Sequence, residues 1–295
     1  MVRRAITFLR RVIQVGLRSP PSERSRALQT FHQPRPTWCP VVLSFLVYCF
    51  NTEDIKKRKS YRKMPLIEDD LILQSDELFA EEKYKESLEV LLDHPNRDDN
   101  VEVLWRIARA TYEATKEMEN TTEKAALIRK GYEFIQRALE LDDKHGCVHT
   151  WYAALLDTNS DQIGIWERLS QLQNVKYHII RATECSPEDP RPWFMLGRFE
   201  FAIADMSWCL LKLMHRIVKE PPTGCYKKAL ECFLQAEKCY PKIDIANHLW
   251  LGKVYVVLKD IEKAKYHFVL ASTGSVTNKD DKKIQEEADK FLKKL

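Results

Sequence analysis

Cations and aromatic side chains are the residues of this sequence whose types and spacing could bind a ligand. Arg109, Arg198 and Lys253 each follow a small Ala or Gly by one position within an apolar helical segment. Arginine presents a planar guanidinium that matches a carboxylate or phosphate, and aromatic rings add rigid contact area. If the three cations line up along one face of the folded chain, they would suit an extended acidic peptide or an anionic head group. The alternative is that they pair with acids on neighbouring helices while the aromatic rings pack internally. The predicted partner-binding groove comprises Trp105, Arg109, Tyr112, Phe194, Arg198, Phe201 and Lys253.

Catalytic and cofactor motifs are absent from the sequence. It contains no HExxH, GxSxG, HRD or P-loop spacing, and its 8 glycines are too far apart to cradle a nucleotide phosphate. His145, Cys147 and His149 straddle a glycine-containing turn without a second ligand pair, so we predict no metal site. The 8 cysteines form no CxxC pair, which favours buried, reduced thiols in an intracellular protein. We therefore expect no enzymatic activity and no cofactor.

Charge divides the chain into two segments. Residues 1–63 carry 14 Lys and Arg against 3 acids, a net charge of +11, whereas residues 64–295 carry 33 bases and 40 acids, a net charge of −7. An acidic body lacks the basic face that displaces phosphate counterions, so we expect no nucleic-acid partner. A charged fraction of 31% and a mean hydropathy of −0.42 argue against a membrane-embedded body.

The basic leader, residues 1–63, is predicted to be largely irregular. Residues 1–18 place apolar side chains on one helical face and arginines on the other. Such a segment resembles a mitochondrial targeting peptide and is equally suited to lie on anionic membrane lipid; the alternative is a poorly ordered leader with chance periodicity. Residues 38–50 are uncharged, but these 13 residues are shorter than the roughly 20 that span a bilayer, so we expect interfacial contact or a local apolar plug. A true transmembrane anchor is the alternative.

Residues 64–295 show the spacing of tetratricopeptide repeats. Gly252 and Ala271 are the small positions of the last unit, and Gly197 and Ala229 mark the preceding one. A small residue on the first helix lets the second approach closely, and stacked units share one continuous core. The sequence predicts an all-α, tetratricopeptide-like helical-repeat solenoid with extended inter-helix insertions, built from about eleven helices with a cap at each end. Residues three before, one after and four after each small residue share the concave face, which defines the groove named above.

An insertion of about 20 residues separates the helices of the unit that begins at Gly197. Leu210, Leu213 and Ile217 recur there with helical spacing, so we expect a long, extended helix pair. Exposed apolar side chains on this segment would mark a partner or lipid site, and core packing is the alternative. The predicted insertion surface comprises Met206, Trp208 and Met214.

Several segments together resemble the regulator of microtubule dynamics proteins. They are LWRIARA at 104–110, HTWYAAL at 149–155, ATECSPEDPRPWFMLGR at 182–198, ADMSW at 204–208, EPPTGCYKKALECFLQAEKCYP at 220–241 and VTNKDDKKIQEEADKFL at 276–292. The resemblance covers about residues 70–295 and implies a helical-repeat protein associated with microtubules and spindle poles, with some members at mitochondria or membrane contacts.

The resemblance and the cation spacing together predict a noncatalytic scaffold that regulates microtubule dynamics through its groove. The expected partners are tubulin or microtubules, whose acidic tails fit three aligned cations, or another acidic protein segment. The expected location is the cytoplasm and cytoskeleton, including the spindle and its poles, with association with mitochondria as a further expectation. The alternative function is a membrane-contact or lipid-binding adaptor at mitochondria.

Overall fold

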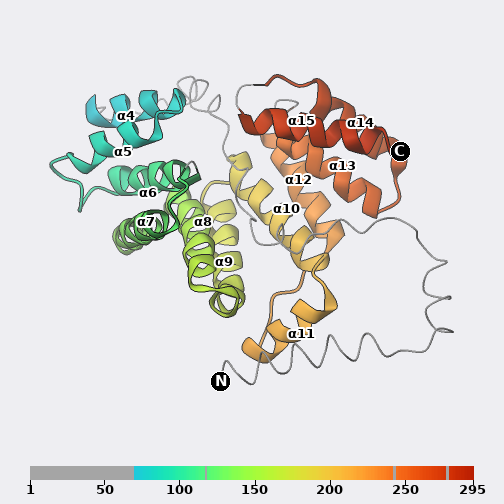
Figure 1. Cartoon of the computed structure of the whole chain (residues 1–295), viewed down its shortest axis with the longest axis horizontal. Coiled ribbons are helices and arrows are strands. Elements are labelled where there is room, and N and C mark those ends of the chain that lie inside the picture. The colour runs from blue at the N-terminus through green and yellow to red at the C-terminus, as the bar shows by residue number, and fades with distance from the viewer. Residues whose placement is uncertain (1–69, 117, 242–243, 277–278) are drawn as a thin grey trace. The chain divides into compact units, whose positions relative to one another are not determined.

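The computed structural model describes residues 70–116, 118–241, 244–276 and 279–295, and within them every regular element is a helix (Figure 1). The predictions made for the leader, including residues 1–18 and 38–50, lie outside the described residues. The helices are α4 (Asp70–Ala80), α5 (Tyr84–Leu92), α6 (Val101–Lys116), α7 (Thr121–Leu141), α8 (Gly146–Ile163), α9 (Ile165–Cys185), α10 (Pro190–Ala204), α11 (Trp208–Ile217), α12 (Tyr226–Cys239), α13 (Ile245–Val257), α14 (Ile261–Thr273) and α15 (Lys279–Leu292).

Helices that lie near one another in the sequence pack side by side in pairs (Figure 1). The pairs are α4 with α5, α6 with α7, α8 with α9, α10 with α12, and α13 with α14, and α15 packs against α13 and α14. α4 and α5 also pack against α6, so the first and last helices of the described residues lie where the sequence predicts caps. This arrangement confirms the all-α helical-repeat fold.

The small residues of the repeat frame make the same contact in two successive units. A Cβ placed on Gly197 would lie 2.6 Å from the Phe233 ring, and one placed on Gly252 would lie 2.5 Å from the Phe268 ring. Only glycine lets the two helices approach this closely, because any side chain would collide with a ring that is itself fully buried. The contact explains why these positions are glycine.

Local sequence fixes where the helices begin. The side chain of Asn120 accepts hydrogen bonds from the backbone N–H groups of Thr122 and Glu123, and Asp244 caps α13 in the same way. Pro190 occupies the start of α10, where its missing N–H costs no helical hydrogen bond. Such caps satisfy backbone donors that have no partner within the helix.

Two apolar clusters lie within the described residues. The larger runs from α6 to α15, and the smaller joins α4, α5 and α6 around Phe79, Leu91 and Ile107. Ser75 and Ser87 fix α4 against α5, because each hydroxyl hydrogen-bonds to the other chain segment in a fully buried position. The N-terminal cap therefore has its own core in addition to its contact with the repeats.

The insertion differs from the extended helix pair that its periodicity predicts. α10 ends at Ala204, and a separate ten-residue helix, α11, begins after the cap residue Ser207, whose hydroxyl accepts a hydrogen bond from the Leu210 N–H. The prediction was wrong here because the helix breaks between Asp205 and Ser207, where a capping hydroxyl competes with helix continuation. By contrast, the extra residues of the preceding units lengthen α7, α8 and α9 to 21, 18 and 21 residues.

Candidate functional site

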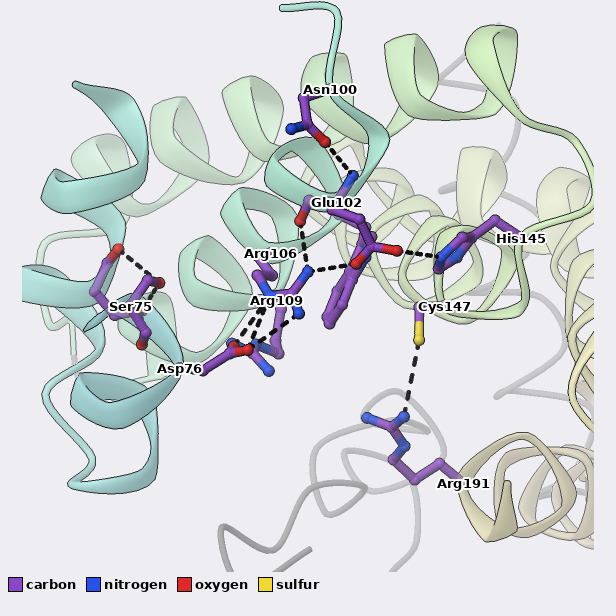
Figure 2. Close-up of polar contacts among 11 residues, drawn as sticks. Ser75, Asp76, Asn100, Glu102, Arg106, Arg109, His145, Cys147 and Arg191 are labelled. Atoms are coloured by element: carbon purple, nitrogen blue, oxygen red, sulfur yellow. Dashed lines mark hydrogen bonds and ion pairs between the residues drawn. The ribbon is translucent and has the colours of Figure 1, made fainter. Parts of the chain in front are cut away.

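The predicted cations lie in two separate clusters, and the first is formed by α6 and the N-terminal cap (Figure 2). The Arg109 guanidinium lies 3.8 Å from the centroid of the Phe79 ring and 5.1 Å from that of Trp105, and it donates a hydrogen bond to Asp76. Arg106 binds both oxygens of the same carboxylate at 3.1 Å. Asp76 of α4 therefore bridges two arginines of α6.

Further polar contacts surround this first cluster. Arg106 also bonds to Glu102, which accepts a hydrogen bond from the Trp105 indole at 3.0 Å and lies 3.1 Å from His145 Nε2. Cys147 Sγ lies 3.9 Å from Arg191 Nη2, on the side of the cluster that faces α10 (Figure 2). The cluster is thus a network of side chains, which a ligand would have to open.

Burial and the paired carboxylate act in opposite directions on the first cluster. Burial lowers the pKa of Arg109 to about 10, although the Asp76 carboxylate opposes this shift. Burial alone would raise the pKa of Asp76, but Arg109 and Arg106 outweigh it and hold that pKa below its ordinary value. The pair is therefore ionised at neutral pH, and removing Asp76 would leave two buried positive charges.

The second cluster joins two neighbouring repeats around Trp250. The Arg198 guanidinium lies 4.9 Å from the centroid of the Trp250 ring, and Lys253 Nζ lies 4.2 Å from it. Lys253 also forms an ion pair with Glu287 of α15 at 2.9 Å. Burial lowers the pKa of Lys253, the nearby charge of Arg198 acts in the same direction, and Glu287 opposes both. Arg198 and Lys253 are thus close enough to repel each other.

Every predicted groove residue is largely buried in the packed interior. Arg109, Arg198 and Lys253 are only 3%, 5% and 6% exposed, and the predicted aromatic side chains are similarly covered. The acids that meet these cations are more accessible, since the side chains of Asp76 and Glu287 are 21% and 41% exposed. A ligand carboxylate could reach Lys253 by replacing that of Glu287. The aromatic members of the predicted groove are Trp105, Tyr112, Phe194 and Phe201.

The repeat between the two clusters carries an acid on the same helical face. Asp157 of α8 forms a two-pronged ion pair with Arg168 of α9, at 2.8 and 2.7 Å, and both side chains are buried. Burial raises the pKa of Asp157 and the guanidinium opposes this shift, with Arg198 also contributing a lowering effect. An internal acid therefore lies between the cations of α6 and those of α10 and α13.

The predicted insertion surface is divided between core and solvent. Met206 and Met214 are 6% and 0% exposed and belong to the main apolar cluster. Trp208, in contrast, is 61% exposed, and Lys212 Nζ lies 4.6 Å from the centroid of its ring. Of the three residues, only Trp208 is available to a partner.

Histidines form two buried pairs that the sequence reasoning missed. His149 Nδ1 lies 2.9 Å from His178 Nδ1, and His248 Nδ1 lies 3.3 Å from His267 Nδ1. All four side chains are less than a tenth exposed. The signal was present in the sequence, because each histidine precedes a small residue of the repeat frame by four positions. These are Ala153, Ala182, Gly252 and Ala271.

Other chemistry-bearing groups are dispersed. Within the described residues, no cluster of three or more His, Cys, Asp or Glu side chains could hold a metal ion. The six described cysteines are free thiols. No helix among the described residues has the length and apolar character needed to cross a bilayer. His145, Cys147 and His149 point to different partners, namely Glu102, Arg191 and His178.

Comparison with known proteins identifies the family. Residues 71–295 match the family model described as Regulator of microtubule dynamics protein 1-3. The chain belongs to this family. It is similar to Regulator of microtubule dynamics protein 1 of Mus musculus, with 27% identity over 269 residues that cover 90% of this chain and 88% of the relative. The orangutan (Pongo abelii) protein of the same description is 30% identical over 222 residues, covering 75% of this chain and 71% of the relative.

A solved structure supports the fold. A thermophilic TPR protein of Thermus thermophilus, TTC0263, superposes with a TM-score of 0.51 at 12% identity, covering 74% of this chain and 97% of that chain. At this identity the similarity shows the tetratricopeptide-like fold alone. Family and fold thus confirm the resemblance and the architecture inferred from the sequence.

Proposed function

We propose that this protein is a noncatalytic scaffold that regulates microtubule dynamics by binding acidic segments of tubulin. The names of its relatives and its tetratricopeptide-like fold support a regulatory, microtubule-related role. Its proposed place of action is the cytoplasm, on the microtubule cytoskeleton of the spindle. The binding site is the set of predicted groove residues, and within it the cluster around Trp250 is the part most able to accept a carboxylate.

The observation that carries this proposal is the placement of Arg198 and Lys253 on one aromatic ring. Two like charges from adjacent repeats approach Trp250 at 4.9 and 4.2 Å, so a carboxylate bound there would gain from both. Bidentate recognition by arginine would add directionality, and the indole would add rigid contact area. An extended acidic peptide would place successive carboxylates along the face that these residues share.

In the absence of a ligand, the carboxylate of Glu287 occupies the position beside Lys253 that a ligand carboxylate would take. Its carboxylate already binds Lys253 at 2.9 Å, and its side chain is 41% exposed, so it can exchange with a carboxylate from another chain. Because Lys253 is only 6% exposed, its ammonium group would be left buried and unpaired without Glu287, so a ligand carboxylate has to take the place of the Glu287 carboxylate. α15 would then regulate access to the site by competing with the ligand.

Co-sedimentation with polymerised tubulin tests the proposal. We expect the full chain to pellet with intact microtubules and to lose most binding when the acidic tubulin tails are removed. Arg198→Gln should weaken binding by roughly 10- to 150-fold, because a charge-assisted contact is worth about 1.5–3 kcal/mol. Lys227→Gln, which removes an exposed cation from α12, is the matched control. Binding that survives both tail removal and Arg198→Gln would contradict this assignment.

A further inference from the structure

α11 is a helix whose apolar residues are incompletely packed. Seven of its ten residues are apolar, yet Met214 is the only fully buried one. Leu210, Leu213 and Ile217 are half-buried against the main core, while Trp208 and Cys209 are exposed. A helix that faces only water and its own domain would bury its tryptophan. The exposed Trp208 therefore gives α11 an apolar face that the rest of the domain does not cover.

Positive charge accompanies this apolar face. From Met206 to Lys219 the chain contains Lys212, Arg216 and Lys219 and no acid. The acids that flank this stretch lie just outside it, at Asp205, which accepts a hydrogen bond from the Tyr226 hydroxyl, and at position 220. Lys212 lies over the Trp208 ring, so cation and indole are presented together.

A second exposed apolar element lies on the helix that packs against α11. α9 contacts α11, and the two helices that meet at the turn between α8 and α9 carry Ile163, the last residue of α8 and 68% exposed, and Trp166, in the first turn of α9 and 51% exposed. Both α11 and this turn lie toward the lower edge of the helical array in Figure 1. Ile163 and Trp208 are the two most exposed large apolar side chains among the described residues. These two most exposed residues thus lie on α8 and α11, which both pack against α9.

We infer that α11, together with the turn between α8 and α9, docks on the surface of an anionic lipid bilayer. Interfacial helices combine Lys and Arg with Trp and Leu and lie in the plane of the interface, as the composition of α11 requires. Tryptophan favours the level of the head groups, where its ring is apolar and its N–H stays hydrated. An acidic protein partner would use the cations but would leave this aliphatic and aromatic area without a role. The docking surface is separate from the Trp250 cluster and does not depend on the proposed function.

Fluorescence quenching of Trp208 tests this inference with the full chain. The signal of Trp208 is taken as the difference between the wild-type protein and Trp208→Phe, and the probe is vesicles of phosphatidylcholine with about 30% phosphatidylserine, with or without bromine on the acyl chains. If α11 docks on the bilayer, the Trp208 ring lies at the boundary between head groups and acyl chains. We then expect brominated lipid to quench this difference signal by roughly half. An unquenched difference signal would overturn the inference, even if the chain binds vesicles through residues 1–63.

Charge substitutions provide a second test that does not depend on folding. Lys212→Gln with Arg216→Gln should lower the partition coefficient about 30-fold, because each basic residue near an anionic surface contributes about 1 kcal/mol. Lys227→Gln with Lys265→Gln removes the same charge from exposed positions on α12 and α14 and should change partitioning by less than about threefold. Equal loss in both double variants would show that only net charge matters and would overturn the docking surface.

Discussion

Acidification should destabilise the repeats through the two buried histidine pairs. In the first pair, His149 Nε2–H donates to the backbone carbonyl of Asp143 at 2.8 Å, so its Nδ1 accepts a hydrogen bond from His178 Nδ1–H. Two neutral rings satisfy this geometry, because one Nδ1 donates and the other accepts. If both rings were protonated, two buried and positively charged Nδ1–H donors would face each other. The second pair, His248 with His267, has the same register in the unit formed by α13 and α14.

The size of the effect follows from the pKa values. Burial lowers the pKa of His178 and of His267 from 6.5 to about 4, and the partner histidine acts in the same direction in each case. Because the unfolded chain takes up protons below pH 6.5 and the folded chain does not, stability is lost as the pH falls from about 6.5 to about 4. Each of these two histidines then lowers the free energy of unfolding by about 2 kcal/mol when the pH falls from 7.5 to 5, so both together lower it by about 4 kcal/mol.

The charged neighbours of the pairs modify this result but do not reverse it. Burial lowers the pKa of His149, and Arg181 adds to this, while Asp142 and Asp143 oppose it. Burial also lowers the pKa of His248, and Glu237, whose carboxylate lies 3.7 Å from its Nδ1, opposes the shift. All four histidines therefore favour the neutral form in the fold.

Urea unfolding at pH 7.5, 6 and 5, followed by far-ultraviolet circular dichroism, measures the loss directly. The double variant His178→Asn with His267→Asn should show a pH-dependent loss smaller by about 4 kcal/mol, since asparagine does not titrate in this range. His215→Asn, at an exposed position on α11, is the matched control. If the wild-type protein is as stable at pH 5 as at pH 7.5, or if the double variant keeps the full loss, the reasoning is wrong.

Three substitutions test the packing of the repeats. Gly197→Ala should destabilise the protein by about 1–3 kcal/mol in urea unfolding, because its Cβ would lie 2.6 Å from the Phe233 ring; an unchanged midpoint would contradict this. Arg168→Met should cost about 3–5 kcal/mol, because it leaves the buried Asp157 carboxylate without its guanidinium; adding Asp157→Leu should recover much of the loss. Gly164→Ala should cost about 1–3 kcal/mol, although nothing lies within 4 Å of the added Cβ, because its φ of 134° disfavours any side chain. Thermal unfolding that detects no difference for Gly164→Ala would refute the backbone argument.

The repeat frame was predictable because its determinants are local. Gly252 and Phe268 lie 16 positions apart on adjacent helices, and the sequence alone indicates that a small residue must face a large one. The histidine pairs follow the same frame, four positions before each small residue, and could have been found by comparing His149 with His248.

The surroundings of the predicted cations could not be derived in this way. Arg109 meets Asp76, which lies 33 residues earlier in the cap, and Lys253 meets Glu287, which lies 34 residues later in α15. Neither capping segment follows the repeat frame. The sequence therefore does not reveal which acid of a cap contacts a cation of the repeats. Trp250 was missed because it falls two positions before Gly252, outside the spacing used to define the concave face.

The affinity of the Trp250 cluster for an acidic peptide tests the proposed function most directly. A glutamate-rich peptide with the composition of a tubulin tail is titrated into the wild-type protein, Glu287→Gln and Glu286→Gln. Removing the Glu287 carboxylate removes the internal competitor and leaves the buried Lys253 ammonium unpaired, so we predict an affinity at least about fivefold higher than that of the wild-type protein. Glu286 is a neighbouring acid on α15, and its substitution makes the same change in net charge. Equal affinities for the two variants, or no measurable binding to any of the three proteins, would contradict this account of the site.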